Sequence, residues 1–408
     1  MAGRRGQNEG SITKRTDGRW MGRVTLPDGR RKAFYGQTRN EVSRKVATAL
    51  HNLEQGMEPT NDKLTVREYL EKWLTMLEHR AGQEGEGLRP TTLRGYRGNV
   101  ELYLVPALGK KRLSRLSPDD VEVMLAGMRD RGLSARTGQY AHAVLRVALK
   151  HALRTGKVHR NVATLADAPR VRREPVEPLS VEEAKIFLEA AKEHLHGPLY
   201  TVALGLGLRR GEVHGLRWED VDLDAERVWI RQTLQRQKGK GLVLVEPKTR
   251  QSRRPLALPD FVVEAFRRQR KIQAEQRLVA GPEWQDTGFV FTMEDGRPMS
   301  PDYTSKHFPI FLREIFTRCP NCDDGHVLEG RCDECGKEAE VKVPTITLHG
   351  LRHSCASLLF AQGCSMRLVM EILGHSQIAL TANTYTHLLP EADREAATAM
   401  QTLLGGDD

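Results

Sequence analysis

The sequence predicts a multidomain chain: an α+β N-terminal part with a three-stranded sheet and a helix, an all-α bundle, and a mixed, mainly α domain with a small antiparallel sheet. The chain has 408 residues, more than one ordinary domain holds, and 39% of them are hydrophobic, enough to build cores. Short strand patterns come first and long helical periodicities follow. Prolines and arginines between residues 166 and 179 predict an extended linker ahead of the last domain.

The first part, residues 1–58, is small and strongly basic. Its predicted elements are strands at 11–15, 20–26 and 31–35 and a helix at 40–55. Asp17-Gly18 and Asp28-Gly29 are typical hairpin turns between the strands. It holds 12 Lys and Arg against six Asp and Glu, so its net charge of +6 is more than half of the +10 of the whole chain. Such a sheet is either a solvated basic surface or a surface that docks in a DNA groove, and the concentrated charge favours the second interpretation.

The second part, residues 62–165, has helical periodicity throughout. A capping box at Thr65–Glu68 precedes an apolar face that recurs every three or four residues. Further helices are predicted at 91–103, from Pro118 onward, and at 135–155. The last part, residues 180–408, opens with a second capping box at Ser180–Glu183 and mixes helices with strands predicted at 228–234, 242–246 and 254–258.

Charge and hydropathy restrict the class of protein. A basic chain with a net charge of +10 favours a polyanionic partner, with nucleic acid as the first candidate. No apolar run approaches the roughly 20 residues of a membrane span. The first ten residues, MAGRRGQNEG, lack the apolar core of a secretory signal, so we expect a cytoplasmic protein without a membrane partner.

Four short motifs in the last part carry side chains that could act on a phosphodiester. They are Gly207-Leu208-Arg209-Arg210-Gly211-Glu212, Pro247-Lys248-Thr249, His349-Gly350-Leu351-Arg352-His353, and Leu373-Gly374-His375 with Tyr385 ten residues later. Each alone has an ordinary explanation, such as a surface arginine, a turn lysine, a helix-end histidine or a packed tyrosine. Together and in this order they resemble the tyrosine recombinase family of the phage integrase type, across residues 180 to 389.

The resemblance implies a function for each part of the chain. Residues 1–58 resemble an arm-type DNA-binding domain, residues 62–165 a helical, SAM-like core-binding domain, and residues 180–408 the catalytic domain. It implies a site-specific recombinase that integrates and excises a mobile element, such as a viral genome. The implied partners are double-stranded DNA at core and arm sites, three further copies in a homotetramer, and, by family analogy, a directionality factor and a host DNA-bending protein.

The resemblance also implies a role for each motif residue. Tyr385 would be the nucleophile that forms a 3′-phosphotyrosyl link. Arg209 and Arg352 would bind the non-bridging phosphate oxygens. Lys248 would protonate the leaving 5′-oxygen, while His349 and His375 would assist proton transfer and hydrogen bonding at the phosphate. Glu212 would support the site, and neither ATP nor a catalytic metal or other catalytic cofactor is needed.

A cysteine cluster predicts a metal site inside the last domain. Cys319, Cys322, Cys332 and Cys335 form two Cys-x-x-Cys turns within a segment that we interpret as an insertion at 317–338. Four thiolates suit a structural Zn²⁺ with no open position, whereas two disulfides or a redox pair would need an oxidising compartment. Cys355 and Cys364 lie outside this spacing and are expected to be ordinary thiols.

Two other functions share part of this evidence. A topoisomerase of type IB uses the same cleavage chemistry without pairing two DNA sites, but it has little use for an arm-like N-terminal domain. A non-catalytic, zinc-containing DNA-binding regulator would explain the charge and the cysteines but not the arginine, lysine, histidine and tyrosine set. Changing Tyr385 to Phe separates the regulator from both enzymes.

Overall fold

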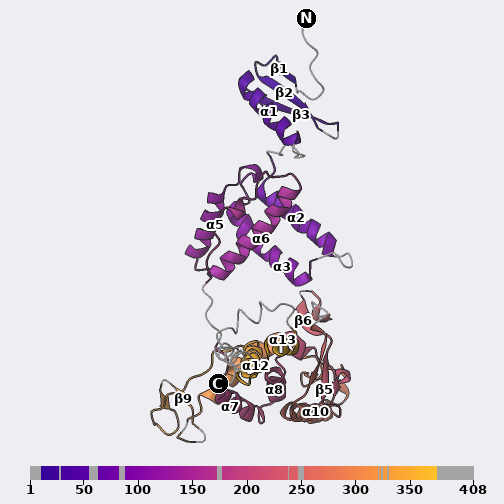
Figure 1. The fold of residues 1–408 in the computed structure, drawn as a ribbon, viewed down its shortest axis with the longest axis vertical. Helices are drawn as coiled ribbons and strands as arrows, with labels where there is room; N and C mark the ends of the chain where they lie inside the picture. The colour runs from indigo at the N-terminus through magenta and orange to yellow at the C-terminus, as the bar shows by residue number, and fades with distance from the viewer. Residues whose placement is uncertain are drawn as a thin grey trace, which may run out of the picture. The chain divides into compact units, whose positions relative to one another are not determined.

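A computed structural model describes residues 11–26, 29–54, 63–81, 88–171, 177–237, 239–246, 252–319, 321–322, 325–328 and 330–374 (Figure 1). By contacts between residues the chain divides into two compact units, Met1–Arg173 and Glu174–Asp408. Within the first unit, the sheet and the helical bundle have separate apolar cores. The boundaries expected near residues 58, 62, 165 and 179 stay predictions. Among the described residues, no helix combines the length and apolarity that crossing a bilayer demands.

The first unit opens with an antiparallel sheet in the order β1-β2-β3. Its elements are β1 (Ser11–Lys14), β2 (Trp20–Thr25), β3 (Arg31–Gly36) and helix α1 (Arg39–Glu54). The helix packs Val42, Val46 and Ala49 against Val24 of the central strand. All four elements match the sequence prediction to within one residue at each end, because glycine turns and apolar periodicity mark their limits.

The rest of the first unit is a helical bundle. Its elements are α2 (Val66–Ala81), α3 (Pro90–Asn99), the π-helical turn η1 (Val100–Leu104), α4 (Val105–Leu108), the 3₁₀ turn η2 (Leu113–Arg115), α5 (Pro118–Asp130), α6 (Ala135–Arg154) and the 3₁₀ turn η3 (Val162–Thr164). The predicted capping box is present, since Thr65 and Glu68 each bond the other's backbone N–H. Helix α6 is central, with Val144, Leu145 and Ala148 fully buried.

The helix predicted at 91–103 is wrong at its C-terminal end. Helical structure continues to Leu108, through Pro106. A proline in a helix has no N–H for the carbonyl four residues earlier and crowds that carbonyl. The wider π-helical turn Val100–Leu104 lies immediately before Pro106 and accommodates this mismatch, so the chain remains helical.

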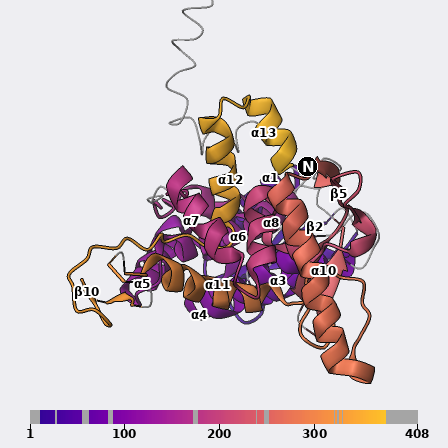
Figure 2. The same ribbon diagram turned by 90° about the horizontal axis from the view of Figure 1, so that it is seen from below.

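The second unit surrounds a buried helix, α8 (Gly197–Gly205), with other helices and short strands (Figure 2). The remaining elements are α7 (Val181–Ala191), α9 (Arg210–His214), η4 (Trp218–Asp220), β4 (Val221–Asp222), β5 (Arg227–Ile230), β6 (Thr233–Gln237), β7 (Gly241–Val245), β8 (Arg254–Ala257), α10 (Asp260–Ala280), η6 (Gly281–Glu283), α11 (Pro301–Phe316), β9 (Val327–Leu328), β10 (Arg331–Cys332), α12 (Gly350–Ala361) and α13 (Met366–Leu373). Helices α7, α10 and α12 all contact α8, which therefore holds the unit together.

The predicted strand 228–234 is two strands in the structure. Strand β5 pairs with β4 and β8 in one antiparallel sheet, whereas β6 pairs only with β7 in a hairpin. The chain leaves the first sheet at Arg231 and Gln232. Residues 228–234 contain no glycine, proline or other turn signal at this break, so the sequence pattern alone does not reveal the change of partner.

Candidate functional site

The first candidate motif forms a tight turn into helix α9. Gly207 has a φ of +57°, and a Cβ there would lie 2.7 Å from Leu373 and 3.1 Å from the Cys355 sulfur, so only glycine fits. Arg209 is the N-cap of α9, and its backbone N–H donates to Oε2 of Glu212 at 3.1 Å. Its guanidinium donates to Oε1 of the same carboxylate at 2.6 Å. Both oxygens of Glu212 therefore fix Arg209.

Glu212 is almost fully buried, with 1% of its surface exposed. Burial alone would raise the pKa of Glu212, but the charges of Arg254 and Arg209 and the hydrogen bonds from Arg209 hold it below its ordinary value. The carboxylate is thus ionised at neutral pH and orients two guanidinium groups.

The end of helix α13 is bound by three arginines from three different elements. Three consecutive backbone carbonyls each accept a hydrogen bond from one guanidinium: Ile372 from Arg254 at 2.6 Å, Leu373 from Arg352 at 2.6 Å, and Gly374 from Arg209 at 2.9 Å. Carbonyls at a helix C-terminus lack helical partners and carry partial negative charge, which explains why cations gather there.

The histidine motif places Arg352 and His349 beside this helix end. His349 is the N-cap of α12, and Arg352 lies in its first turn with only 2% of its surface exposed. Arg352 also donates to the carbonyl of Gly207 at 2.8 Å, so it ties the first motif to the end of α13. The structure therefore brings Arg209 and Arg352 to adjacent peptide groups.

His349 is exposed at the surface, and its imidazole lies near several cationic side chains. Loss of hydration first, and then the positive charges of His353, Arg352 and Arg209, lower the pKa of His349 to about 4. Its ring lies 5.2 Å from the ring of His353 at a right angle. At neutral pH His349 is therefore uncharged and able to accept a proton.

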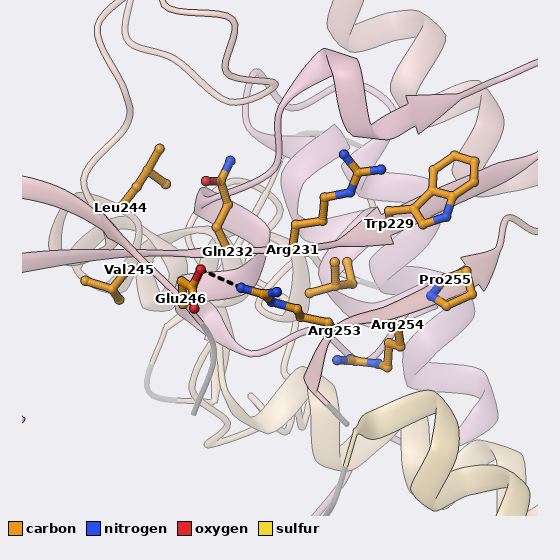
Figure 3. A pocket seen from close by; sticks show the side chains of 10 residues that line it. Trp229, Arg231, Gln232, Leu244, Val245, Glu246, Arg253, Arg254 and Pro255 are labelled. Atoms are coloured by element: carbon orange, nitrogen blue, oxygen red, sulfur yellow. Dashed lines mark ion pairs between the residues drawn. The ribbon is translucent and has the colours of Figure 1, made fainter. Parts of the chain in front are cut away.

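The loop that carries Lys248 connects β7 to β8, and residues 247–251, Lys248 among them, lie outside the described residues. Its two described ends are joined by an ion pair of 2.6 Å between Arg253 and Glu246, drawn in Figure 3. Both residues line a cavity of about 530 Å³ beside β5 and β8. This ion pair thus holds together the two chain segments that flank the loop, next to the strand that carries Arg254.

His375 and Tyr385 also lie outside the described residues, which end at Gly374. The described part of the site therefore consists of Arg209, His349 and Arg352. Gly374, with a φ of +64°, caps α13 in the left-handed conformation. Arg254 stands in none of the motifs and was not predicted from the sequence. A signal was nevertheless present in the sequence. Arg254, Leu256 and Leu258 are spaced two residues apart, so a charged side chain shares the buried face of β8 with two leucines.

The four clustered cysteines lie together in a second, separate place. Their sulfur atoms are all within 4.8 Å of one another, with Cys319 3.7 Å from Cys335 and Cys322 3.6 Å from Cys332. Four sulfurs at about 2.3 Å from a central zinc ion would be about 3.8 Å apart, so the geometry fits a tetrahedral S₄ site. These four cysteines could hold a metal ion.

Backbone groups support thiolates in this cluster. The N–H of Cys335 donates to the Cys332 sulfur at 3.4 Å, the largest of several hydrogen bonds that lower the pKa of Cys332 to about 7, whereas loss of hydration raises the pKa of Cys322. The N–H of Asn321 donates to the Cys319 sulfur at 3.3 Å. Cys355 is buried elsewhere and Cys364 is half-buried, and neither belongs to the cluster.

Residues 325–392 match the Phage integrase family. An integrase of Saccharopolyspora erythraea is 27% identical over 96% of this chain and 95% of its own length. A XerC-like tyrosine recombinase of Caldanaerobacter subterraneus is 26% identical over 93% of this chain and 96% of its own length.

Two kinds of solved structure share the fold. The Tn1549 transposon integrase in complex with a circular intermediate DNA is 22% identical, covers 83% of this chain and 100% of its own, and has a TM-score of 0.66. A lambda integrase tetramer bound to a Holliday junction is 16% identical, covers 90% of this chain and 95% of its own, and has a TM-score of 0.51. The N-terminal sheet, the helical bundle and the small antiparallel sheets of this chain are consistent with that multidomain fold.

Proposed function

We propose that this chain is a site-specific DNA recombinase that cleaves and rejoins DNA for a mobile element, with Tyr385 as its nucleophile. The observation that carries the proposal is the convergence of Arg209 and Arg352 on adjacent carbonyls, Gly374 and Leu373, with His349 beside them. Two guanidinium groups and a neutral imidazole form a site for one phosphodiester.

The reaction begins with attack by the Tyr385 oxygen on the scissile phosphorus. The bond from phosphorus to the 5′-oxygen breaks, which leaves a 3′-phosphotyrosyl link and a free 5′-hydroxyl. The phenolic proton leaves the nucleophile, and Lys248 supplies a proton to the departing oxygen. Because the energy of the phosphodiester is kept in the link, a 5′-hydroxyl of another strand reverses the step without ATP or a catalytic metal.

Arg209 and Arg352 would stabilise the charge that develops on the non-bridging oxygens. A guanidinium offers five N–H donors in a fixed plane, so an arginine that already donates to a carbonyl can still donate to a phosphate oxygen. Arg209 keeps 34% of its side chain exposed while it holds Glu212 and Gly374. His375 follows Gly374 directly in the sequence and would donate to a phosphate oxygen.

His349 would accept or relay the proton at the tyrosine. In the free chain the pKa of His349 is lowered to about 4, first by loss of hydration and then by neighbouring cations. A bound phosphate would neutralise part of that positive charge and raise the pKa of His349 toward its ordinary range. A base that becomes stronger only when DNA is present suits a nucleophile that must not react without it.

Cys319, Cys322, Cys332 and Cys335 would hold a structural Zn²⁺ in the insertion at 317–338. Four sulfur ligands leave no open position, so the ion would contribute stability and no chemistry. The cluster begins where α11 ends: the N–H of Val327 donates to the carbonyl of Thr317 at 2.6 Å. The ion would therefore fix the segment that connects α11 to the helix of Arg352.

The remaining parts of the chain would bind the rest of the DNA. Residues 1–58 would contact arm sites, and residues 62–165 would clamp the core site together with residues 180–408. Because recombination needs two pairs of strand exchanges, four copies would assemble on two DNA sites in the cytoplasm. A directionality factor and a host DNA-bending protein would act as helpers.

The proposal is tested by covalent capture in bacterial cells that carry the element's own DNA. Wild type, Tyr385→Phe and Tyr303→Phe proteins are denatured rapidly and purified, and the attached DNA is sequenced. Tyr303→Phe is the matched control, because it removes from the same unit a phenolic hydroxyl that hydrogen-bonds the imidazole of His196 and belongs to none of the four motifs. Wild type and the control should carry DNA from a few discrete loci and Tyr385→Phe none. Equal capture by Tyr385→Phe would refute the assignment of the nucleophile.

Joint molecules distinguish a recombinase from a topoisomerase. Two duplexes that carry the captured core sequence and differ in length are mixed with the wild-type protein. Products that join one duplex to the other are expected from the recombinase. Relaxation of supercoiled plasmid without any joint product would indicate the topoisomerase instead.

A further inference from the structure

A third buried arginine lies behind the two motif arginines. Arg254 stands on β8 at an inward-facing position, with 7% of its surface exposed. Its guanidinium donates to the carbonyl of Ile372 at 2.6 Å, to the carbonyl of Ser252 at 3.2 Å and to Oε2 of Glu212 at 3.3 Å. One side chain thus links three segments that are far apart in the sequence.

Through Glu212, Arg254 reaches Arg209. The two guanidinium groups bind different oxygens of the carboxylate: Oε1 accepts from that of Arg209 at 2.6 Å, and Oε2, which also accepts from the Arg209 backbone N–H, accepts from that of Arg254 at 3.3 Å. Each guanidinium therefore limits how the carboxylate can rotate. A carboxylate whose rotation is restricted in this way fixes the orientation of the Arg209 guanidinium.

Through Ile372, Arg254 also fixes the end of α13. The next two carbonyls, of Leu373 and Gly374, are the ones that Arg352 and Arg209 bind. Gly374 lies directly against Arg254, since a Cβ at Gly374 would come within 2.7 Å of its Nη1. Movement of Arg254 would therefore displace both the carboxylate and the carbonyls that hold the motif arginines.

We propose that Arg254 is a positioning residue for DNA cleavage, which aims Arg209 through Glu212 and sets the direction in which the chain leaves α13 toward His375. This proposal rests on the proposed function of Arg209. Arg254 touches no reacting atom. A buried ion pair by itself is weak evidence for a contribution to stability, and the arrangement of these bonds around the motif arginines favours a role in their alignment.

The test uses the full-length protein and a duplex with the captured core sequence, nicked so that the 5′-hydroxyl fragment diffuses away and the covalent adduct accumulates. Four proteins are compared: wild type, Arg254→Gln, Arg254→Lys and the control Arg268→Gln. Arg268 is a matched control, because its guanidinium also donates to a carbonyl at a helix end, that of Ala191 at 2.9 Å, away from the motif arginines. Single-turnover adduct formation and DNA affinity are measured for each.

Arg254→Gln should slow adduct formation by about 100-fold while its DNA dissociation constant stays within about threefold of wild type, the pattern of a lost transition-state interaction. Arg254→Lys, which keeps the charge but fewer donors, should recover about a tenth of the wild-type rate. Arg268→Gln should cleave like wild type even if its melting temperature falls. This comparison distinguishes misalignment of the motif arginines from a general loss of stability.

The pH profile supplies a readout that loss of stability would not change. Arg254 and Arg209 are the charged groups that hold down the pKa of Glu212 against its burial. With Arg254→Gln the pKa of Glu212 should rise, so the cleavage rate of this variant should increase with pH over a range in which the wild-type rate does not. The wild-type rate should lack this additional rise.

Three results would overturn the proposal. They are a rate for Arg254→Gln within threefold of wild type, a rate loss equal to that of Arg268→Gln at the same change in melting temperature, and a variant pH profile parallel to that of wild type. A wild-type protein that forms no adduct with the core duplex would instead refute the proposed function, so the two failures are distinguishable.

Discussion

Arg209 donates a hydrogen bond of 2.9 Å to the carbonyl of Gly374, which lies 165 residues further along the chain. This contact joins the turn after α8 to the residue before His375. It explains why two motifs so distant in sequence form one site. A substitution at either residue should therefore change the position of the other.

Replacing Arg209 with Lys should slow adduct formation by about 10²–10³-fold, because a lysine cannot keep Glu212, Gly374 and a phosphate oxygen bound at once. DNA affinity should change much less, since most of the phosphate contacts lie elsewhere. The control is Arg210→Lys: Arg210 is the adjacent arginine, and its guanidinium donates to Ser305 on α11 at 2.9 Å. Single-turnover kinetics on a nicked core duplex would measure both, and equal losses for the two variants would contradict the assignment.

Replacing Gly374 with Ala should abolish most cleavage. Its φ of +64° strains any other residue by about 1 kcal/mol, and the new Cβ would meet Arg254. Gly363→Ala is a matched control, because Gly363 has a φ of +77° but nothing within 4 Å of the added carbon. Both variants should lose stability in urea unfolding, Gly374→Ala more because of its contact with Arg254, and only Gly374→Ala should lose cleavage. Full activity in Gly374→Ala would show that the end of α13 tolerates displacement.

The purified protein should contain one zinc ion per chain, measured by plasma mass spectrometry. Cys332→Ser should lose the ion and lower the melting temperature, because three sulfur ligands bind Zn²⁺ more weakly than four. Cys364→Ser, at a cysteine outside the cluster, should keep both. A chelator should destabilise wild type and leave Cys332→Ser unchanged. A wild-type protein with full stability and no bound metal would exclude a structural zinc site.

The chain should lose stability as the pH falls from about 6.5 toward 4. His214 is fully buried, and burial lowers its pKa from 6.5 to about 4. In this window the unfolded chain binds a proton at this residue and the folded chain does not, so protonation favours unfolding. The loss should be about 2 kcal/mol at about pH 5 for this histidine. Urea unfolding of His214→Gln against pH should show a shallower dependence, whereas His79→Gln, at an exposed histidine, should follow wild type.

Much of the fold was predictable because its signals are local. Thr65 and Glu68 cap a helix through contacts only three residues apart, and the strands of the N-terminal sheet end at turns that the sequence marks. The continuation of the helix through Pro106 was not predictable, since a π-helical turn can accommodate a proline that would otherwise stop the helix. The division of 228–234 into β5 and β6 depends on strand partners, which a period of two does not encode.

The candidate site shows the same division. The motifs predicted which side chains matter, because Arg209, His349 and Arg352 stand in recognisable local patterns. The motifs did not include Arg254, whose importance lies in its bonds to Glu212 and Ile372. Those bonds depend on how β8 packs against α9 and α13, and no short pattern records such packing. Lys248, His375 and Tyr385 keep their predicted roles as proposals.

The most direct test of the central claim is to identify the residue that becomes linked to DNA. The adduct formed with a nicked core duplex is digested with trypsin and nuclease and analysed by mass spectrometry. The peptide of residues 368–394 contains no internal Lys or Arg, and Tyr385 is its only tyrosine. We predict a nucleotide joined through its 3′-phosphate to Tyr385. A nucleotide on another residue, or a link through a 5′-phosphate, would contradict the account.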